Sequence, residues 1–258
     1  MESSLYAKQN THFSAYVYWA IEIGRDLLAN GAEAWRVEDT VRRILEAYGA
    51  REVDVFSITS SLVVTATVED EKTYTQTRRV ASIHNDMMKI DELNELSRLI
   101  CSEKIPPGEI RLKMEKIRLQ NGYPKGVIFM AYALIAGAFT VFFGGNLRDF
   151  LAAAFIGFLL CGVELFIRRG TANPLLTAFL WSLVGGILCS LSVKIGLGVH
   201  RDLISIGNIM LFIPGIAFTN SIRDLFSGDT ISGLIRVLES LILAAVIAFG
   251  FTCVGFIM

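Results

Sequence analysis

About five long apolar runs fill the second half of this sequence, and they limit what the chain can fold into. Each run is close to the ~20 residues that a helix needs to cross ~30 Å of hydrocarbon. Polar and charged stretches separate the runs, a pattern that one buried core of a soluble protein does not explain. The runs are Val127–Gly144, Phe150–Ile167, Pro174–Val193, Leu203–Phe218 and Leu234–Ile257.

Charged residues are concentrated in the other half of the chain. Before Pro124 there are 19 acidic and 16 basic residues, and after it 6 acidic and 8 basic. The net charge is −1, so no basic excess favours nucleic acid as a partner. We therefore expect a mainly α membrane protein: a small α+β cytosolic domain at residues 1–123, then a transmembrane domain of about five helices at residues 124–258.

Hydrophobic periodicity predicts the elements of the first domain. Apolar residues at helical spacing indicate four helices, and stretches rich in β-branched residues between them indicate three strands. The expected order is two helices, a small antiparallel sheet and two more helices. The predicted helices are 14–30, 32–49, 86–100 and 108–122, and the predicted strands are 51–58, 62–69 and 72–80.

The distribution of Lys and Arg near the ends of the runs predicts the orientation in the membrane. Eight such residues lie on the side of the N-terminal domain and three on the other side. Because cytoplasmic loops carry the excess of positive charge, we expect a cytoplasmic N-terminus in a multi-pass membrane protein surrounded by lipid. The first residues show no apolar core after a basic start, so we expect no cleaved signal peptide.

Residue types also exclude some chemistry. The four cysteines show no CxxC spacing, and there are only three histidines, so we expect no disulfide framework, no metal site and no cofactor. No glycine-rich phosphate loop is present that would make the chain an ATPase. We find no set of nucleophile and base within the runs, and therefore do not expect an enzyme.

The fourth apolar run is unusual because it contains Asn208 and the pair Pro214-Gly215. Proline removes a backbone donor and glycine loosens the helix, so the run is expected to break there. In lipid, the released carbonyls need partners or line a wet cavity, as in the broken helices of many secondary transporters. A simple packing kink is the alternative interpretation.

Ionisable and polar residues continue from the end of this run into the last one. Ionisable groups within a span are costly and usually face a partner or a water-filled path. A carboxylate that can be protonated, with an arginine that can hold a carboxylate, suits a proton-coupled carrier of organic acids or amino acids. The alternative is that these groups lie at the interface and reach the lipid headgroups. We predict that Thr219, Asn220, Arg223 and Asp224 approach the substrate, with Asp229, Arg236 and Glu239 completing the lining or carrying the coupling proton.

Two stretches carry a resemblance to a known family. "GAEAWRVEDTVRRI" at 31–44 and "PGIAFTNSIRDLFSGDTISGLIRVLESLILA" at 214–244 resemble signatures of the threonine/serine exporter family. The resemblance implies a secondary exporter of the bacterial inner membrane, for threonine and serine or for C4-dicarboxylates such as succinate. It also implies the larger subunit of a split form, with a smaller membrane subunit as partner. It supplies no established map of site residues.

Other interpretations remain open at this point. The partner could be a second copy of this chain, since about five spans lack the second half that single-chain members have. The chain could also be a membrane-anchored ligand sensor or assembly factor without transport activity. The sequence of "GAEAWRVED" fits a binding site that includes Trp35, Arg36 and Glu38, and it equally fits a helix face with salt bridges.

Overall fold

The computed structural model describes residues 2–69, 71–120, 122–170 and 173–257. The chain forms two compact units, each described here by itself: unit 1 comprises Met1–Asn121 and Ile216–Leu238, and unit 2 comprises Gly122–Gly215 and Glu239–Met258. Residues 216–238 thus pack with the first part of the chain, whereas the sequence predicts a single boundary after residue 123. The functional division into a cytosolic and a transmembrane domain stays a prediction.

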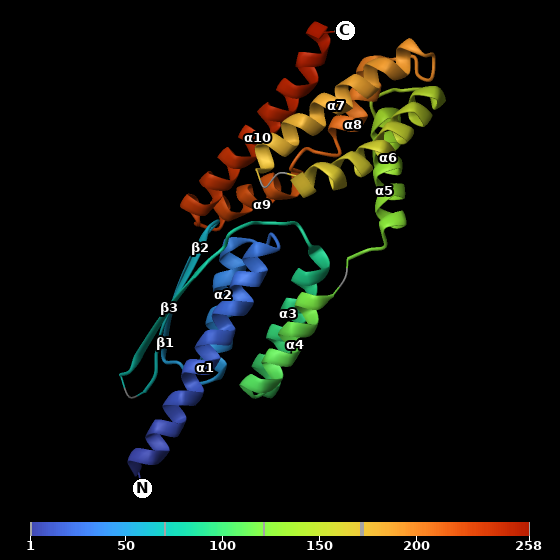
Figure 1. The fold of residues 1–258 in the computed structure, drawn as a ribbon. Coiled ribbons are helices and arrows are strands. Elements are labelled where there is room, and N and C mark those ends of the chain that lie inside the picture. Colours follow the sequence, from blue (N-terminus) through green and yellow to red (C-terminus); the bar gives the residue numbers. More distant parts are fainter. Residues whose placement is uncertain (1, 70, 121, 171–172, 258) are drawn as a thin grey trace. The chain divides into compact units, whose positions relative to one another are not determined.

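The first part of unit 1 has the predicted order of elements (Figure 1). Two helices precede a three-stranded sheet and two helices follow it, as the hydrophobic periodicity indicates. The helices are α1 (Glu2–Ala29), α2 (Ala34–Ala47), α3 (Met87–Glu103) and α4 (Pro107–Leu119). The strands are β1 (Glu52–Ile58), β2 (Ser61–Thr67) and β3 (Thr73–Arg79). Unit 1 also contains most of α9 (Gly215–Phe226) and the start of α10 (Thr230–Ile257).

The sheet is antiparallel with β2 in the centre. Val55 of β1 is opposite Val64 of β2, and Thr65 of β2 is opposite Thr75 of β3. Alternate residues of β2, including Val64, are fully buried, whereas no residue of β3 is buried. Since successive side chains of a strand point to opposite faces, one face of the sheet covers the core and the other is open.

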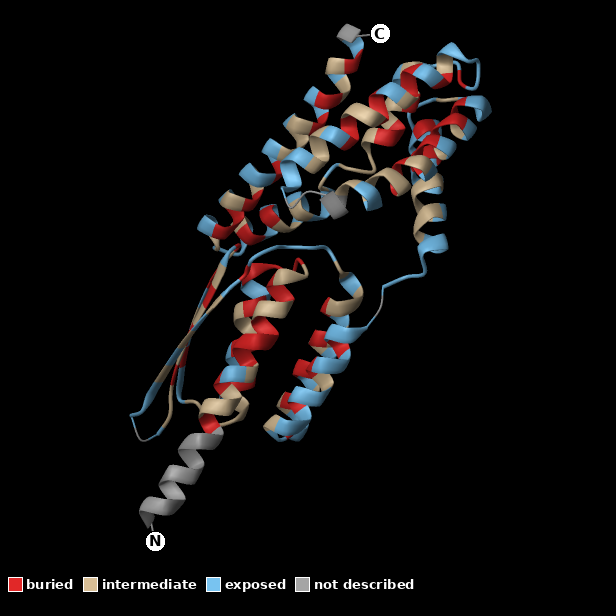
Figure 2. Cartoon of the chain, viewed as in Figure 1, coloured by how far each residue is buried: buried red, intermediate tan, exposed pale blue. Residues whose placement is uncertain are grey.

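The core of unit 1 forms where α1 meets the apolar faces of the other elements. Ile21 of α1, Val41 of α2, Leu62 of β2, Ile100 of α3 and Met114 of α4 are fully buried. Figure 2 shows buried residues along α1 and α2. Burying a side chain of this size stabilises a fold by about 1.5–3 kcal/mol relative to leaving it exposed.

A buried carboxylate joins three elements of this unit. Glu22 of α1 contacts Arg78 of β3 and Arg118 of α4, each at 2.7 Å, and Arg25 at 2.9 Å. Burial by itself raises the pKa of Glu22, but the hydrogen bonds from Arg78 and Arg118 hold it below its ordinary value. Glu22 therefore stays charged and holds α4 and β3 against α1.

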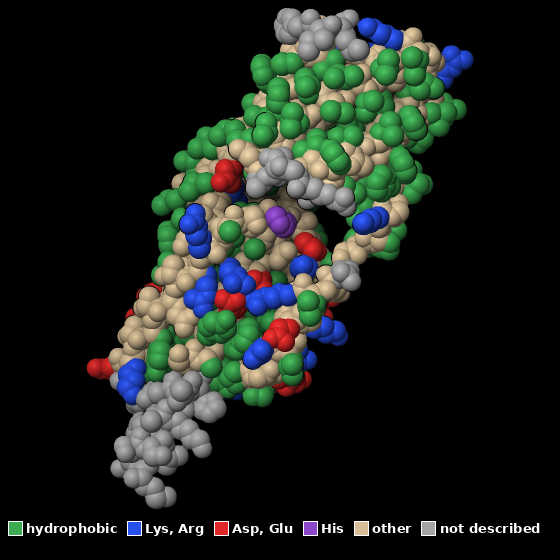
Figure 3. Space-filling view, viewed as in Figure 1, with side chains coloured by type: hydrophobic (Ala, Val, Ile, Leu, Met, Phe, Trp, Pro, Cys, Tyr) green, Lys and Arg blue, Asp and Glu red, His purple; other side chains and the backbone are tan. Residues whose placement is uncertain are grey.

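Unit 2 is built from long apolar helices. Its elements are α5 (Lys125–Phe142), α6 (Leu147–Gly170), α7 (Pro174–Lys194), α8 (Arg201–Ile209) and the second part of α10. Within the described residues, four helices are long and apolar enough to cross a membrane: α5, α6, α7 and α10. At most 39% of the most apolar window of each is buried, and hydrophobic side chains cover the helices of unit 2 in Figure 3. Such a surface requires hydrocarbon around it, so the chain is a multi-pass membrane protein.

The fourth predicted span is interrupted, as its Pro214-Gly215 pair predicts. In place of Leu203–Phe218 the chain forms α8, which ends at Ile209, and α9, which begins at Gly215. Pro214 lacks the backbone N–H that would continue α8 and its ring clashes with the preceding turn. With 9 and 12 residues, neither helix is long enough to span a bilayer alone. The described residues therefore contain four candidate spans, and the fourth predicted span is a helix pair with a break.

Small residues allow α5 and α6 to approach closely. A Cβ atom on Gly157 of α6 would lie 2.7 Å from the carbonyl oxygen of Tyr132 on α5. Ala136 of α5 and Ala153 of α6 are fully buried in the same cluster. Small side chains at such contacts let helix backbones pack in membranes, where no hydrophobic effect drives helices together.

A second buried carboxylate fixes the loop before α8. Asp149, in the first turn of α6, accepts hydrogen bonds from the backbone N–H groups of Val199 and His200 at 2.7 and 2.9 Å. Its other oxygen lies 2.8 Å from Nδ1 of His200 and accepts from the backbone of Asn146 at 3.1 Å. Asp149 is fully buried, so its loss would leave several donors without an acceptor.

We predict that Asp149→Ala lowers the free energy of unfolding by about 3 kcal/mol, because hydrogen bonds to a buried charge are lost together. The measurement is the thermal unfolding midpoint of the purified protein in detergent. Asp202→Ala is the matched control, since Asp202 is exposed in the first turn of α8. Equal midpoints for the two variants would contradict the assigned role of Asp149.

Candidate functional site

A cluster of buried polar groups lies within unit 1, where α9 and the start of α10 meet the segment before α2. The contributing residues of α9 and α10 come from the second stretch that resembles the exporter family, and those before α2 come from the first. The residues in contact, such as Ala34 and Asp224, are 190 positions apart in the sequence. We call this arrangement the capping cluster and define it as Gly31, Ala32, Glu33, Ala34, Asn220, Arg223, Asp224 and Arg236.

Asp224 is the centre of the cluster. It is fully buried, and its Oδ1 accepts a hydrogen bond from the backbone N–H of Ala34 at 3.0 Å. Ala34 is the first residue of α2, and the preceding Glu33 makes no side-chain capping bond. Asp224 therefore satisfies an N–H group that the helix itself cannot, and its negative charge lies at the positive end of the helix dipole.

Arg236 lies beside this carboxylate. Nη1 of Arg236 is 3.3 Å from Oδ2 of Asp224, and Nη2 donates to the carbonyl oxygen of Ala32 at 3.1 Å. The Arg236 side chain is 6% exposed. The contact between Arg236 and Asp224 is an ion pair that lacks hydrogen-bond geometry. Oδ2 of Asp224 accordingly has no hydrogen-bond partner among the described residues.

Two further contacts hold the segment before α2 to α9. Arg223 forms an ion pair with Glu33, whose side chain is almost fully buried. Asn220 donates from Nδ2 to the carbonyl oxygen of Gly31 at 3.1 Å. Gly31 has a φ of +94°, and a Cβ there would lie 2.6 Å from Oδ1 of Asn85. Gly31 therefore allows the turn that presents both carbonyl groups to α9 and α10.

More carboxylates adjoin the capping cluster. Oε1 of Glu38 accepts from the backbone and the hydroxyl of Ser57 at 2.7 and 2.9 Å. Burial raises the pKa of Glu38 against these hydrogen bonds, and the charge of Asp229 raises it further. Burial also raises the pKa of Asp229. The carboxylate of Asp229, in the turn between α9 and α10, thus raises the pKa of Glu38 on α2 through charge repulsion.

Burial raises the pKa of Asp224 to about 6, from an ordinary value of 3.8. Arg236 and the N–H of Ala34 act in the opposite direction, whereas the nearby charges of Asp229 and Glu33 add to the rise. A carboxyl group with this pKa changes charge near neutral pH, so protons can bind and leave it under cellular conditions.

Several buried atoms in and next to the cluster have no hydrogen-bond partner among the described residues. They are Oε2 of Glu33, Oδ2 of Asp224, Oδ2 of Asp229 and Oγ of Ser232. Buried polar atoms are normally hydrogen-bonded, so their accumulation here indicates a capacity to bind a polar molecule or ion. No three His, Cys, Asp or Glu side chains of the described part are grouped so as to hold a metal ion.

The structure brings only part of the predicted site together. Asn220, Arg223, Asp224 and Arg236 belong to the capping cluster, and Asp229 adjoins it. Thr219 is exposed on α9, and Glu239 is exposed on α10, where Arg236 pairs with Asp224 and not with Glu239. Asn208 is fully buried in unit 2, with Nδ2 donating to the carbonyl oxygen of Ile204 at 3.0 Å. Pro214 and Gly215 lie at the break between α8 and α9.

Sequence reasoning did not assign the partners of these side chains. Glu33 and Ala34 take part through a carboxylate and a backbone N–H, and Gly31 and Ala32 through carbonyl groups. Backbone groups leave no signal in residue types. The one available signal is that "GAEAWRVED" is among the stretches that resemble the family.

Comparison with known proteins agrees with these features. The family model ThrE, described as "Putative threonine/serine exporter", matches residues 19–258. The chain is 24% identical over 245 residues to the "Threonine/serine exporter" of Corynebacterium glutamicum, covering 90% of this chain and 49% of that protein. It is 25% identical over 247 residues to the "Probable succinate transporter subunit YjjP" of Escherichia coli K12, covering 92% and 91%. The YjjP of Klebsiella aerogenes is 22% identical over 237 residues.

The four apolar helices define a multi-pass membrane protein, and the matches show its family. The chain belongs to the threonine/serine exporter family. It spans about half the length of the Corynebacterium glutamicum exporter and most of the length of YjjP. No solved structure matches the chain.

The ion pair between Glu33 and Arg223 gives one testable prediction. Glu33→Gln and Arg223→Gln each lower the unfolding midpoint, and the double variant loses no more than the larger single change. The expected coupling energy is on the order of 1 kcal/mol, because the Arg223 side chain is half-exposed. A double-mutant cycle of thermal unfolding measures it, and additive effects would contradict the pair.

The raised pKa of Asp224 gives a second prediction. The folded state holds this proton more tightly than the unfolded chain, so the contribution of Asp224 to the free energy of unfolding falls as pH rises between about 4 and 6. Above pH 6 the contribution stays at its lower value. Asp224→Asn removes the titration, so the midpoint of the variant relative to wild type rises by the equivalent of about 3 kcal/mol across this window.

Thermal unfolding between pH 4 and pH 7.5 tests this difference. Asp91→Asn on the exposed side of α3 is the control, because it removes a carboxylate outside the capping cluster. A constant difference between Asp224→Asn and wild type over the whole range would contradict a raised pKa.

Proposed function

We propose that this chain is a subunit of a secondary exporter that carries small polar metabolites out across the bacterial inner membrane, driven by the proton gradient. The observation that carries the proposal is the buried Asp224–Arg236 pair at the first turn of α2. It joins a carboxyl group that titrates near neutral pH to an arginine whose side chain is almost fully buried. Membership in the exporter family supports the class of transport.

The substrate class follows from the chemistry of the pair and from the names of the relatives. The guanidinium of Arg236 suits a carboxylate, which it can bind with two parallel hydrogen bonds. One relative is named a threonine/serine exporter and others a probable succinate transporter subunit. Amino acids of the threonine and serine type and C4-dicarboxylates such as succinate both carry the required carboxylate.

The proposed coupling is an exchange of partners at Arg236. When Asp224 is charged, it pairs with Arg236 and caps α2. When Asp224 takes up a proton, the ion pair is lost and the guanidinium can accept a substrate carboxylate in its place. Protonation also weakens the contact with Ala34, so the segment before α2 moves more freely relative to α9. Proton binding and substrate binding would then be linked through one arginine.

The other predicted path residues stay part of this proposal on sequence grounds. Thr219 and Asp229 flank the cluster on the chain. Asn208, Pro214, Gly215 and Glu239 belong to unit 2, where the chain breaks between α8 and α9. Turn hydrogen bonds occupy the carbonyl groups of Asn208, Ile209 and Ile213 at this break. Broken helices line the substrate sites of many secondary transporters.

We also propose a partner and an orientation. The Corynebacterium glutamicum relative is about twice as long as the matched region, and the shorter relatives are named subunits. A smaller membrane subunit of the same family, or a second copy of this chain, would supply the other half. The excess of Lys and Arg places the N-terminus in the cytoplasm. The side chains of Arg168 and Arg169, which enter that count, lie outside the described residues.

Efflux from loaded cells tests the function. Cells are loaded with succinate or with peptides containing serine and threonine, and they express this chain alone or with a candidate smaller membrane subunit. We expect efflux of one substrate class that depends on the partner. Asp224→Asn and Arg236→Gln should each lower it at least about tenfold, a rise in the barrier of ~1.4 kcal/mol.

Asp91→Asn is again the matched control and should export at the wild-type rate, and the amount of each variant in the membrane is measured. Wild-type flux in Asp224→Asn and Arg236→Gln would exclude the capping cluster from transport. If neither substrate class moved in any combination, a ligand sensor or assembly factor would replace the exporter as the proposed function.

A further inference from the structure

A cavity of about 590 Å³ lies between α2 and α3 in unit 1, apart from the residues of the capping cluster. Its volume is within the range of small-molecule sites, which is about 300–1,000 Å³. Each helix contributes one face, at the i, i+4, i+8 spacing of successive helical turns. The lining residues of α2 are Trp35, Arg36, Asp39, Thr40 and Arg43, and those of α3 are Asn94, Ser97, Arg98, Cys101 and Ser102.

The charges in the cavity are unbalanced. Three arginines face one carboxylate, and that carboxylate is already occupied, because Asp39 lies 2.9 Å from Nε of Arg43. Within the described part of the chain, neither Arg36 nor Arg98 has a carboxylate at ion-pair distance. Two guanidinium groups from different helices therefore remain to hold negative charge.

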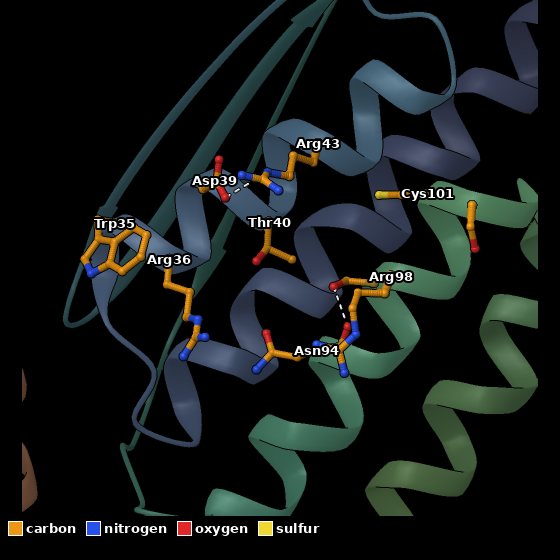
Figure 4. Close-up of a pocket in the computed structure, with 10 residues that line it drawn as sticks. Trp35, Arg36, Asp39, Thr40, Arg43, Asn94, Arg98 and Cys101 are labelled. Carbon is orange, nitrogen blue, oxygen red and sulfur yellow. Dashed lines mark hydrogen bonds and ion pairs between the residues drawn. The ribbon is translucent and has the colours of Figure 1, made fainter.

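The arrangement of side chains allows both to reach one ligand. In Figure 4, the guanidinium groups of Arg36 and Arg98 lie on the two sides of Asn94. Thr40 and Ser97, both 8% exposed, contribute polar groups to the cavity wall. Arg78 and Arg118, by contrast, pair with the buried carboxylate of Glu22 within the fold. The contrast between these two kinds of arginine favours a ligand.

We propose that this cavity binds a small organic dianion, either a dicarboxylate or a phosphate monoester. Arg36 and Arg98 hold its two negative charges or its phosphate group, since guanidinium binds both by paired hydrogen bonds. Asn94 and Thr40 supply neutral hydrogen bonds, and Trp35 covers one end. Inorganic anions lack the carbon framework that the volume of the cavity accommodates. The site is independent of the proposed export path, because it shares no residue with the capping cluster.

Binding is measured on the purified full-length protein in detergent at 150 mM salt, so that weak surface attraction is screened. The probes are succinate, adenosine monophosphate and inorganic phosphate, and the readouts are calorimetry and tryptophan fluorescence, to which Trp35 contributes. Saturable binding of succinate or of the nucleotide is expected. The two organic probes distinguish a dicarboxylate from a phosphate monoester.

The variants separate the cavity from the rest of the surface. Arg36→Gln with Arg98→Gln should weaken binding at least about tenfold, because two charge-assisted hydrogen-bond donors are lost. Arg98→Gln alone should weaken it less. Arg51→Gln removes an exposed arginine outside the cavity and should leave binding unchanged. Arg36 and Arg98 are both exposed, so the variants at these two positions should keep the wild-type unfolding midpoint.

Three outcomes would overturn the proposal: no saturable binding of either organic probe, wild-type affinity in the double variant, or equal weakening by Arg51→Gln. Binding of inorganic phosphate alone would also overturn it, since the cavity would then select no organic ligand. Adenosine monophosphate tests the cavity separately from export, because the proposed substrates of the export path are amino acids and C4-dicarboxylates.

Discussion

The first turn of α2 has a backbone N–H that no group of its own helix or loop can bind, and much of unit 1 is arranged around that need. Ordinarily the side chain that precedes a helix supplies the acceptor. Here that residue is Glu33, which turns to Arg223, and the acceptor is Asp224 from a helix about 190 residues later. A local requirement of one helix is thus met by a distant one. Residues 216–238 therefore pack with the first part of the chain.

Burial makes this contact sensitive to protons. A carboxylate that is fully buried is costly to keep charged, and only the nearby guanidinium of Arg236 and the N–H of Ala34 compensate. The balance raises its pKa to about 6, so the charged form prevails at neutral pH and the protonated form becomes accessible with a small fall in pH. The raised pKa of Asp224 weakens its contact with Ala34 as a structural support. It also makes the contact suitable for coupling proton binding to a change in the segment before α2.

The apolar part of the chain follows simpler rules. The side chains of α5, α6 and α10 face outward as hydrocarbon requires, and small residues such as Gly157 and Ala153 bring helices together. Where polar groups occur, they are bound internally: Asp149 accepts from the loop before α8, and Asn208 donates to its own helix. These contacts fix loops and turns. Buried atoms without a hydrogen-bond partner among the described residues occur in both units, at Oγ of Ser190 and Oδ1 of Asn208 in unit 2 and at Oδ2 of Asp224 in the capping cluster.

The sequence by itself determined the class of the fold, because hydrophobic period and run length are local properties. It predicted the helices and strands of the first part, the long apolar helices, and the break at Pro214-Gly215, where a missing N–H and a ring clash act on their own residues. It also identified Asn220, Arg223, Asp224 and Arg236 as unusual in their surroundings. Only the tertiary structure decided what these side chains contact. The partners of Asp224 and Arg236 are a backbone N–H and a carbonyl group of the segment before α2, and every residue carries such groups, so their use depends on how the chain folds back on itself.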